Sequence, residues 1–240
     1  MREWIIQSFI NSSSRILEIG CSTGFIAYQI NKLTGAKVTG IDLSKDSIEK
    51  AKMNCLGMEG CEFFVSDAIN LNFKNESFTH VILGGHLPWV LESERSKHLK
   101  EAVRVLKTDG FLLTSLYYFS TKPSKNFLDK FNNEFGTSLT ANGGYNYWSS
   151  LFHIPELSLY YESNYKIIYP SNKRKKAYLS VFNIDHLPEW ENKVNLFIQN
   201  GNYLSFFVKV FRKEKNNIYR QYPRGGIYTW KKIDLVEKEK

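Results

Sequence analysis

The chain has 240 residues and a net charge of +8, and 42% of its residues are hydrophobic. This length fits one α/β domain with an additional segment better than two full domains. No apolar run approaches the roughly 18 residues of a membrane-spanning helix, and the first residues lack the apolar core of a signal peptide. These two features predict no membrane partner. The three cysteines lack the paired spacing of disulfide or zinc sites, so we also expect no metal and a cytoplasmic protein.

The positive charge is confined to one half of the chain. The first 120 residues hold equal numbers of acidic and basic side chains, so residues 121–240 carry the whole +8. A basic half of this kind suits an acidic partner such as a nucleic acid. A solvated lysine-rich surface explains it equally well.

The first elements along the chain are a short helix, a strand and a second helix. Residues 4–10 have the pattern of a brief helix, residues 15–19 are a short apolar run typical of a buried strand, and residues 24–33 have the spacing of an amphipathic helix. Gly20 and Gly24 lie in the turn between the strand and the second helix. Glycine permits positive φ and the close approach of a ligand, and the start of a helix offers unpaired N–H groups. This strand–turn–helix therefore predicts a site for a nucleotide-like ligand.

The residues of the turn distinguish between two classes of ligand. A dinucleotide site needs the pattern G-x-G-x-x-G, but Ser22 stands where the middle glycine would be. Glu18, near the end of the strand, would repel a pyrophosphate and attract a ligand with ammonium and sulfonium charge. The stretch "LEIGCSTGFIA" resembles the first motif, E/D-x-G-x-G-x-G, of the class I S-adenosylmethionine (SAM)-dependent methyltransferases and departs from it only at Ser22. The resemblance implies SAM as cofactor, S-adenosylhomocysteine as product, and cofactor contacts from Glu18, Gly20, Cys21, Ser22 and Gly24.

The second strand, residues 37–41, leads to another carboxylate. Asp42 lies 22 positions after the first glycine of the turn, close to the roughly 20-residue spacing at which an acid meets a ribose hydroxyl pair. Its two oxygens can accept from both hydroxyls, and Leu43 follows it as a further cofactor contact. The alternative is that Asp42, together with Ser44, caps the next helix, residues 45–55.

The third strand, residues 62–65, leads to Asp67. In the methyltransferases that this chain resembles, an acid at the end of the third strand accepts a hydrogen bond from the adenine amino group. The resemblance implies this role for Asp67, with the Ala68 N–H as a second contact. The alternative is a loop aspartate that begins a turn.

The fourth strand, residues 78–83, ends in a loop that contains Gly84 and His86. Ligands of open parallel sheets lie outside the carboxyl ends of the strands, so we expect this loop beside the methyl donor. It resembles the corresponding loop of small-molecule methyltransferases and lacks the N/D-P-P-Y/F motif of amino-methylating DNA and protein enzymes. We expect Gly84 to allow close backbone approach, and His86 could take a proton from the acceptor as a general base. The alternatives are that His86 only forms hydrogen bonds within its loop, or that it closes over the sulfonium pocket without acid–base work.

The next helix and strand complete the resemblance. Residues 93–106 have a clear helical period, and residues 111–118 form an apolar strand. The stretch "LKEAVRVLKTDGFLLTS" resembles the L-x-E-x-x-R-V-L-K-P-G-G stretch of the family, with Thr108-Asp109 in place of Pro-Gly. Alternating strands and helices predict an α/β fold with a doubly wound, mostly parallel sheet. The resemblance implies the seven-stranded Rossmann-like methyltransferase fold, with an antiparallel last strand at residues 203–211 inserted between its neighbours and a C-terminal cap.

After this core the pattern loosens. We expect helices over residues 123–135 and 147–152, a strand over 157–168, and an insertion over 170–200 with a helix at 190–198. Aromatic side chains are abundant here, and together with the loop after the fourth strand they are expected to form the acceptor pocket. The alternative for each aromatic is ordinary core packing. The expected pocket residues are His86, Trp89, Tyr117, Tyr118, Tyr147 and Trp148.

These observations predict a division of the chain into four segments and leave several candidate functions. We expect an N-terminal helix (1–14), a SAM-binding core (15–118), the remainder of the sheet with cap insertions (119–213) and a basic tail (214–240). The favoured function is O- or N-methylation of a small-molecule acceptor. The alternatives are an RNA methyltransferase that uses Lys173–Lys176 and the tail, and a SAM enzyme or SAM-binding protein that does not methylate. A homodimer is compatible with the sequence.

Overall fold

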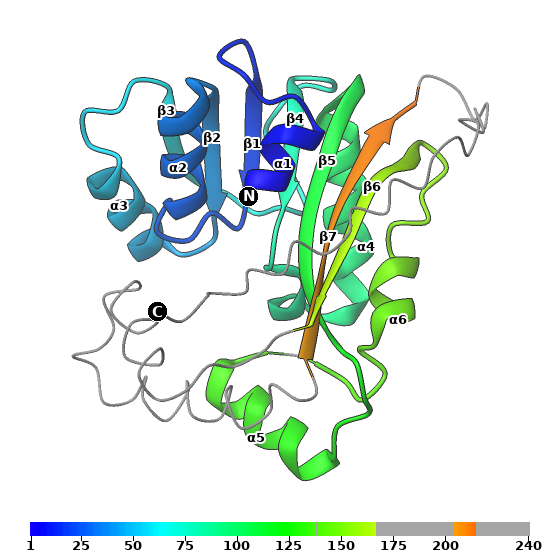
Figure 1. Ribbon diagram of the computed structural model, residues 1–240. Coiled ribbons are helices and arrows are strands. Elements are labelled where there is room, and N and C mark those ends of the chain that lie inside the picture. Colours follow the sequence, from blue (N-terminus) through cyan, green and yellow to red (C-terminus); the bar gives the residue numbers. More distant parts are fainter. Residues whose placement is uncertain (138, 167–203, 215–240) are drawn as a thin grey trace, which may run out of the picture.

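A seven-stranded sheet organises the chain, in the order β3-β2-β1-β4-β5-β7-β6 (Figure 1). This is a computed structural model, and it describes residues 1–137, 139–166 and 204–214. The strands are β1 (Arg15–Ile19), β2 (Lys37–Asp42), β3 (Cys61–Val65), β4 (Phe78–Leu83), β5 (Leu106–Phe119), β6 (Leu157–Lys166) and β7 (Leu204–Lys213). The helices are α1 (Arg2–Gln7), α2 (Phe25–Thr34), α3 (Lys45–Asn54), the 3-10 turn η1 (Leu87–Trp89), α4 (Glu92–Val105), α5 (Lys125–Phe135) and α6 (Tyr145–Ser150).

The direction of the strands confirms the predicted fold class. The strands from β3 to β5 pair in parallel, whereas β7 runs antiparallel to both β5 and β6 and lies between them. The strand order reverses at β1, which lies between β2 and β4. Such a reversal leaves a crevice at the carboxyl ends of the strands, where ligands of open α/β sheets bind.

Each face of the sheet is covered by its own hydrophobic core. Because side chains alternate along a strand, Ile16 of β1 packs in the core of α1, α2 and α3. Its neighbours Leu17 and Ile19 pack in the core that includes α4 and α6. The helices therefore form two layers around a buried sheet, and β1 is held from both sides.

The start of β5 differs from the sequence expectation. β5 begins at Leu106, not at residue 111, because the polar residues 107–110 lie within the strand. Phe78 of β4 pairs with Leu106 and His80 pairs with Phe111, so the extra residues of β5 form a bulge in which Asp109 has φ +64°. The predicted insertion at 170–200, its Lys173–Lys176 cluster and the tail from residue 215 lie outside the described residues.

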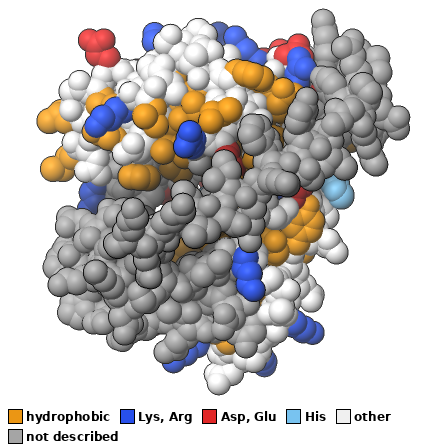
Figure 2. Space-filling view, in the orientation of Figure 1, with side chains coloured by type: hydrophobic (Ala, Val, Ile, Leu, Met, Phe, Trp, Pro, Cys, Tyr) orange, Lys and Arg blue, Asp and Glu red, His pale blue; other side chains and the backbone are white. Residues whose placement is uncertain are grey.

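The surface of the N-terminal helices carries exposed hydrophobic side chains. Phe25 and Leu33 of α2 and Met53 of α3 are more than half exposed, and Figure 2 shows hydrophobic side chains on this part of the molecule, with lysine and arginine side chains scattered among them. Within the described residues, no helix is long and apolar enough to cross a membrane.

Candidate functional site

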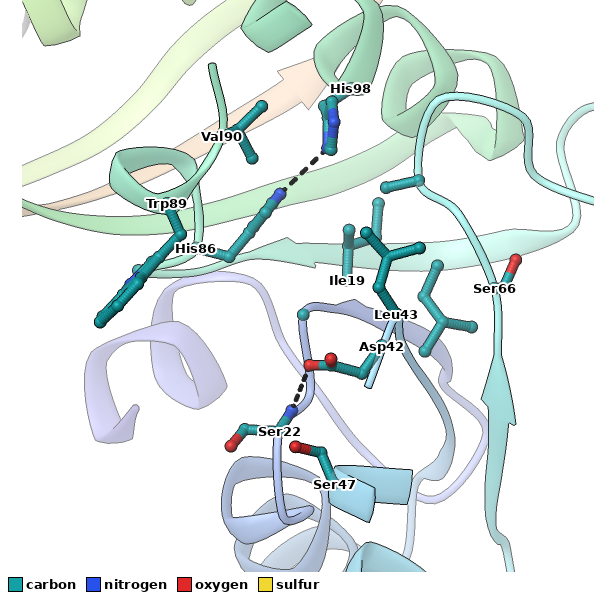
Figure 3. Close-up of a pocket in the computed structure, with 14 residues that line it drawn as sticks. Ile19, Ser22, Asp42, Leu43, Ser47, Ser66, His86, Trp89, Val90 and His98 are labelled. Atoms are coloured by element: carbon teal, nitrogen blue, oxygen red, sulfur yellow. Dashed lines mark hydrogen bonds between the residues drawn. The ribbon is translucent and has the colours of Figure 1, made fainter. Parts of the chain in front are cut away.

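A cavity of about 550 Å³ opens at the carboxyl ends of the central strands, at the strand-order reversal (Figure 3). Its walls come from the turn after β1, the end of β2, the loops after β3 and β4, and one side chain each from α3 and α4. The lining residues are Ile19, Gly20, Ser22, Ile41, Asp42, Leu43, Ser47, Ser66, Ala68, Gly85, His86, Trp89, Val90 and His98.

The glycine turn after β1 is fixed to β2 and packs closely against the loop after β4. The N–H groups of Gly20 and Cys21 both donate to the Ile41 carbonyl, at 2.8 and 2.9 Å. Gly20 has φ +73°, and a Cβ atom there would lie 2.7 Å from the Cβ of His86. A glycine is therefore required both by the backbone conformation and by the contact with His86.

Asp42, at the carboxyl end of β2, accepts hydrogen bonds from two backbone N–H groups. Its Oδ2 accepts from the Ser22 N–H and its Oδ1 from the Ser44 N–H, both at 2.9 Å. Ser44 itself caps α3, because its hydroxyl accepts from the Ser47 N–H at 3.2 Å. Each carboxylate oxygen can accept more than one hydrogen bond. Asp42 therefore keeps acceptor capacity toward the cavity, which a pair of ribose hydroxyls would use.

The loop after β3 contributes backbone and small side chains. Ser66 and Ala68 line the cavity, whereas Asp67 between them is exposed and its Oδ1 accepts from the Ile69 N–H at 3.0 Å. Of the two expected adenine contacts, Ala68 lies in the wall and Asp67 lies beside it.

Three residues that the sequence predicts as cofactor contacts, Glu18, Cys21 and Gly24, do not line the cavity. Glu18 shares the α2-facing side of β1 with Ile16 and is 3% exposed, and Cys21 is part of the same core. Gly24, with φ +80°, precedes α2 as its N-cap. Burial raises the pKa of the Glu18 carboxyl to about 8. Glu18 is not among the residues that line the cavity, and its contact with a cation stays a prediction.

Two histidines meet in the opposite wall. The ring of His86, from the loop after β4, points at His98 of α4, and the distance from His86 Nε2 to His98 Nδ1 is 3.3 Å (Figure 3). Burial and the neighbouring His98 lower the pKa of His86 to about 3. Burial also lowers the pKa of His98, and the charges of Asp67 and Glu94 partly oppose this. Gly85 lines the cavity in place of the expected Gly84.

A buried arginine fixes the loop that carries His86. Arg95 of α4 is 1% exposed, and its Nε donates to the carbonyls of Leu87 and Val90, at 3.0 and 3.2 Å. Its Nη1 donates to the Tyr147 hydroxyl at 2.6 Å. The turn η1 is therefore tied to both α4 and α6.

Two of the six residues expected in an acceptor pocket, His86 and Trp89, line this cavity. Trp89 lines the cavity and is 55% exposed, on the side of His86 away from His98 (Figure 3). Tyr117, Tyr118, Tyr147 and Trp148 are not among the lining residues. Trp148 instead belongs to the core, 1% exposed, with the Arg95 guanidinium 4.7 Å from its ring. The reason is that α6 packs against the sheet and turns this side chain inward.

Sequence reasoning missed several lining residues, above all His98. The sequence does contain an indication of His98, because it lies four positions before Ala102 on the buried face of α4. A titratable side chain within an apolar stripe is unusual. Ser47 and Ser66 had no signal, because only the fold brings them to the cavity. Among the described residues, no three His, Cys, Asp or Glu side chains gather as metal ligands would.

Known proteins resemble this chain in sequence and in fold. The family described as "Methyltransferase domain" matches residues 16–110. A protein of Haemophilus influenzae described as uncharacterized is 30% identical over 116 residues, which are 47% of this chain and 46% of that protein. The demethylmenaquinone methyltransferase of Staphylococcus epidermidis is 31% identical over 106 residues, 43% of each chain. The matched stretch is thus a little less than half of these relatives. The crystal structure of a protein named MccD has a TM-score of 0.75 and 25% identity, and the alignment covers 89% of this chain and 95% of that one.

Proposed function

We propose that this chain, whose residues 16–110 match the family described as "Methyltransferase domain", is a class I SAM-dependent methyltransferase and transfers a methyl group from SAM to a small-molecule acceptor. The observation that carries the proposal is the Asp42 carboxylate, held by two N–H groups in the wall of a cavity at the strand-order reversal. We assign residues 15–118 to cofactor binding and residues 119–213 to the rest of the sheet and the cap.

The residues of the wall fit the parts of SAM. Asp42 would accept from the ribose hydroxyls, and Leu43 and Ala68, which line the same cavity, would contact the adenine. The turn at Gly20 and Ser22 would lie against the amino-acid part. Asp67 would accept from the adenine amino group with the carboxylate oxygen that does not accept from Ile69.

The chain contributes position and environment to the reaction. SAM, when bound, supplies an electrophilic methyl group on a sulfonium. The His86–His98 pair and Trp89 form the remaining wall, and they would hold the acceptor in line with that methyl group and keep water away. The name of the staphylococcal relatives, demethylmenaquinone methyltransferases, supports an acceptor of the small-molecule class.

Calorimetric titration with SAM and with S-adenosylhomocysteine tests the proposal. We expect micromolar binding of both. Asp42→Asn should weaken both by about 10- to 100-fold, because hydrogen bonds to a charged partner contribute about 1.5–3 kcal/mol. Asp46→Asn is the matched control, since Asp46 is an exposed aspartate of α3 outside the cavity. Absence of binding by the folded protein, or equal effects of the two substitutions, would contradict the assignment.

Product analysis then separates the remaining alternatives. A methylated small molecule together with S-adenosylhomocysteine supports the proposal. Binding of SAM that never yields S-adenosylhomocysteine would indicate a SAM-binding protein or other chemistry. Affinity for RNA that falls steeply with salt would favour the RNA methyltransferase.

A further inference from the structure

The two histidines in the cavity wall form a pair in which only one can donate. His86 comes from the loop after β4 and His98 from α4, and both line the cavity. His86 Nε2 and His98 Nδ1 are 3.3 Å apart, a long hydrogen bond. A neutral imidazole has one N–H and one lone pair, so the proton position on His86 determines the proton position on His98.

The surroundings of His86 select one of the two arrangements. His86 Nδ1 is buried and has no hydrogen-bond partner among the described residues. If Nδ1 carried the proton, a buried N–H would be left unpaired, which is rare in proteins. The Nε2–H form is also the more stable tautomer of a free neutral histidine. His86 Nε2–H therefore donates to His98 Nδ1, and His98 keeps its own proton on Nε2.

The environment also keeps the pair neutral. Burial and the second imidazole hold the pKa of His86 at about 3. The charged groups that face His98 are Asp67 after β3 and Glu94 on its own helix, and burial lowers its pKa in spite of both. Neutral imidazoles of low basicity are poor proton acceptors near pH 7, but a neutral imidazole N–H can polarise a substrate oxygen.

We propose that His98, aligned by His86, donates its Nε2–H to an oxygen of the acceptor, and that the acceptor is a phenolate or an enolate. This inference rests on the proposed function and names its substrate class. The acceptor loses its proton to water before it binds, so no side chain has to take one. The bond from the acceptor to the methyl carbon then forms as the methyl–sulfur bond breaks, and the electron pair of that bond stays on sulfur. His98 acts as the catalytic residue and His86 as its positioning residue.

The first test reads the tautomers directly, without cofactor. Long-range ¹H–¹⁵N NMR spectra of the ¹⁵N-labelled protein at pH 6 to 8 should show protonated Nε2 and unprotonated Nδ1 for both histidines. His86→Phe and His98→Phe assign the signals. A proton on Nδ1 of His98, or a charged His98 across this range, would overturn the inference.

The second test uses variants that differ in donor capacity. His98→Gln keeps an N–H near the position of Nε2, and His98→Leu does not. With a panel of phenols and β-dicarbonyl compounds as acceptors, we expect kcat of His98→Gln within about 10-fold of the parent and kcat of His98→Leu about 10- to 100-fold lower. The exposed His153→Gln is the matched control. Equal losses in both His98 variants, or turnover of amines in place of these acceptors, would refute the inference.

Binding of SAM separates this inference from the proposed function. His98→Gln and His98→Leu should bind S-adenosylhomocysteine as the parent does. If the parent protein binds neither SAM nor its product, the proposed function fails, whereas the NMR result on the histidine pair stands independently.

Discussion

The stability of the protein should depend on the protonation of one buried carboxyl, that of Glu18. Glu18 is 3% exposed, its Oε2 has no hydrogen-bond partner among the described residues, and the Ala27 N–H is the backbone donor that lowers its pKa. Burial nevertheless raises its pKa from 4.5 to about 8. A carboxyl with a raised folded-state pKa contributes stability that is complete below pH 4.5 and is lost as the pH rises through 8.

The size of this effect follows from the two pKa values. Each tenfold change in proton affinity corresponds to about 1.4 kcal/mol, so the rise from 4.5 to about 8 removes at most about 5 kcal/mol from the free energy of unfolding above pH 8. Glu18→Gln keeps an oxygen for the Ala27 N–H and cannot ionise. The variant should therefore match the parent near pH 4.5 and become progressively more stable than the parent as the pH rises to 8.

Urea unfolding at several pH values between 5 and 8.5 measures this difference. The titration of all other groups is common to both proteins and cancels. Glu59→Gln, at an exposed glutamate, is the control, and its difference from the parent should not change with pH. If the difference between Glu18→Gln and the parent is also independent of pH, Glu18 is ionised in the folded protein, and the reasoning is wrong.

Three further substitutions test other contacts. Gly20→Ala places a Cβ atom 2.7 Å from His86 at φ +73°, so it should lower the free energy of unfolding by about 1–3 kcal/mol in urea titrations and weaken SAM binding. Arg95→Met removes two hydrogen bonds to backbone carbonyls of the loop after β4, and it should speed amide hydrogen exchange in residues 86–90 while exchange in β1 stays slow. Lys209→Met leaves Glu162 without its buried partner at 3.5 Å and should lower the melting temperature. Adding Glu162→Gln should restore most of that loss, and a double variant no more stable than the single one would argue against the ion pair.

The parts of the fold that could be predicted are those with local signals. β1 and β4 are short apolar runs bounded by polar or glycine residues, and their predicted bounds are confirmed. The predicted start of β5 at residue 111 is wrong, because Thr108-Asp109-Gly110 has the composition of a turn but lies within the strand. Only the pairing of β5 with β4 shows that these residues are a bulge within a strand.

The same distinction applies to the site. Gly20 and Asp42 line the cavity, and their turn and spacing are visible in one segment of the sequence. His98 and the inward position of Trp148 depend on how α4 and α6 pack on the sheet. Contacts between segments far apart in the chain leave no local pattern, and this is why the sequence alone does not show which histidine and aromatic side chains line the cavity.

The insertion of β7 between β5 and β6 has a consequence for synthesis on the ribosome. Residues 204–213 pair with both neighbours. Until this late segment has emerged, β5 can pair only with β4, and β6 lacks its β7 partner. The N-terminal strands can pair earlier, because they are complete by residue 119. The nascent chain therefore passes through a stage in which β5 and β6 have open strand edges, which are prone to pair wrongly. Chaperone demand should be concentrated in that interval, and folding should be slow because its last pairing joins residues about 100 positions apart.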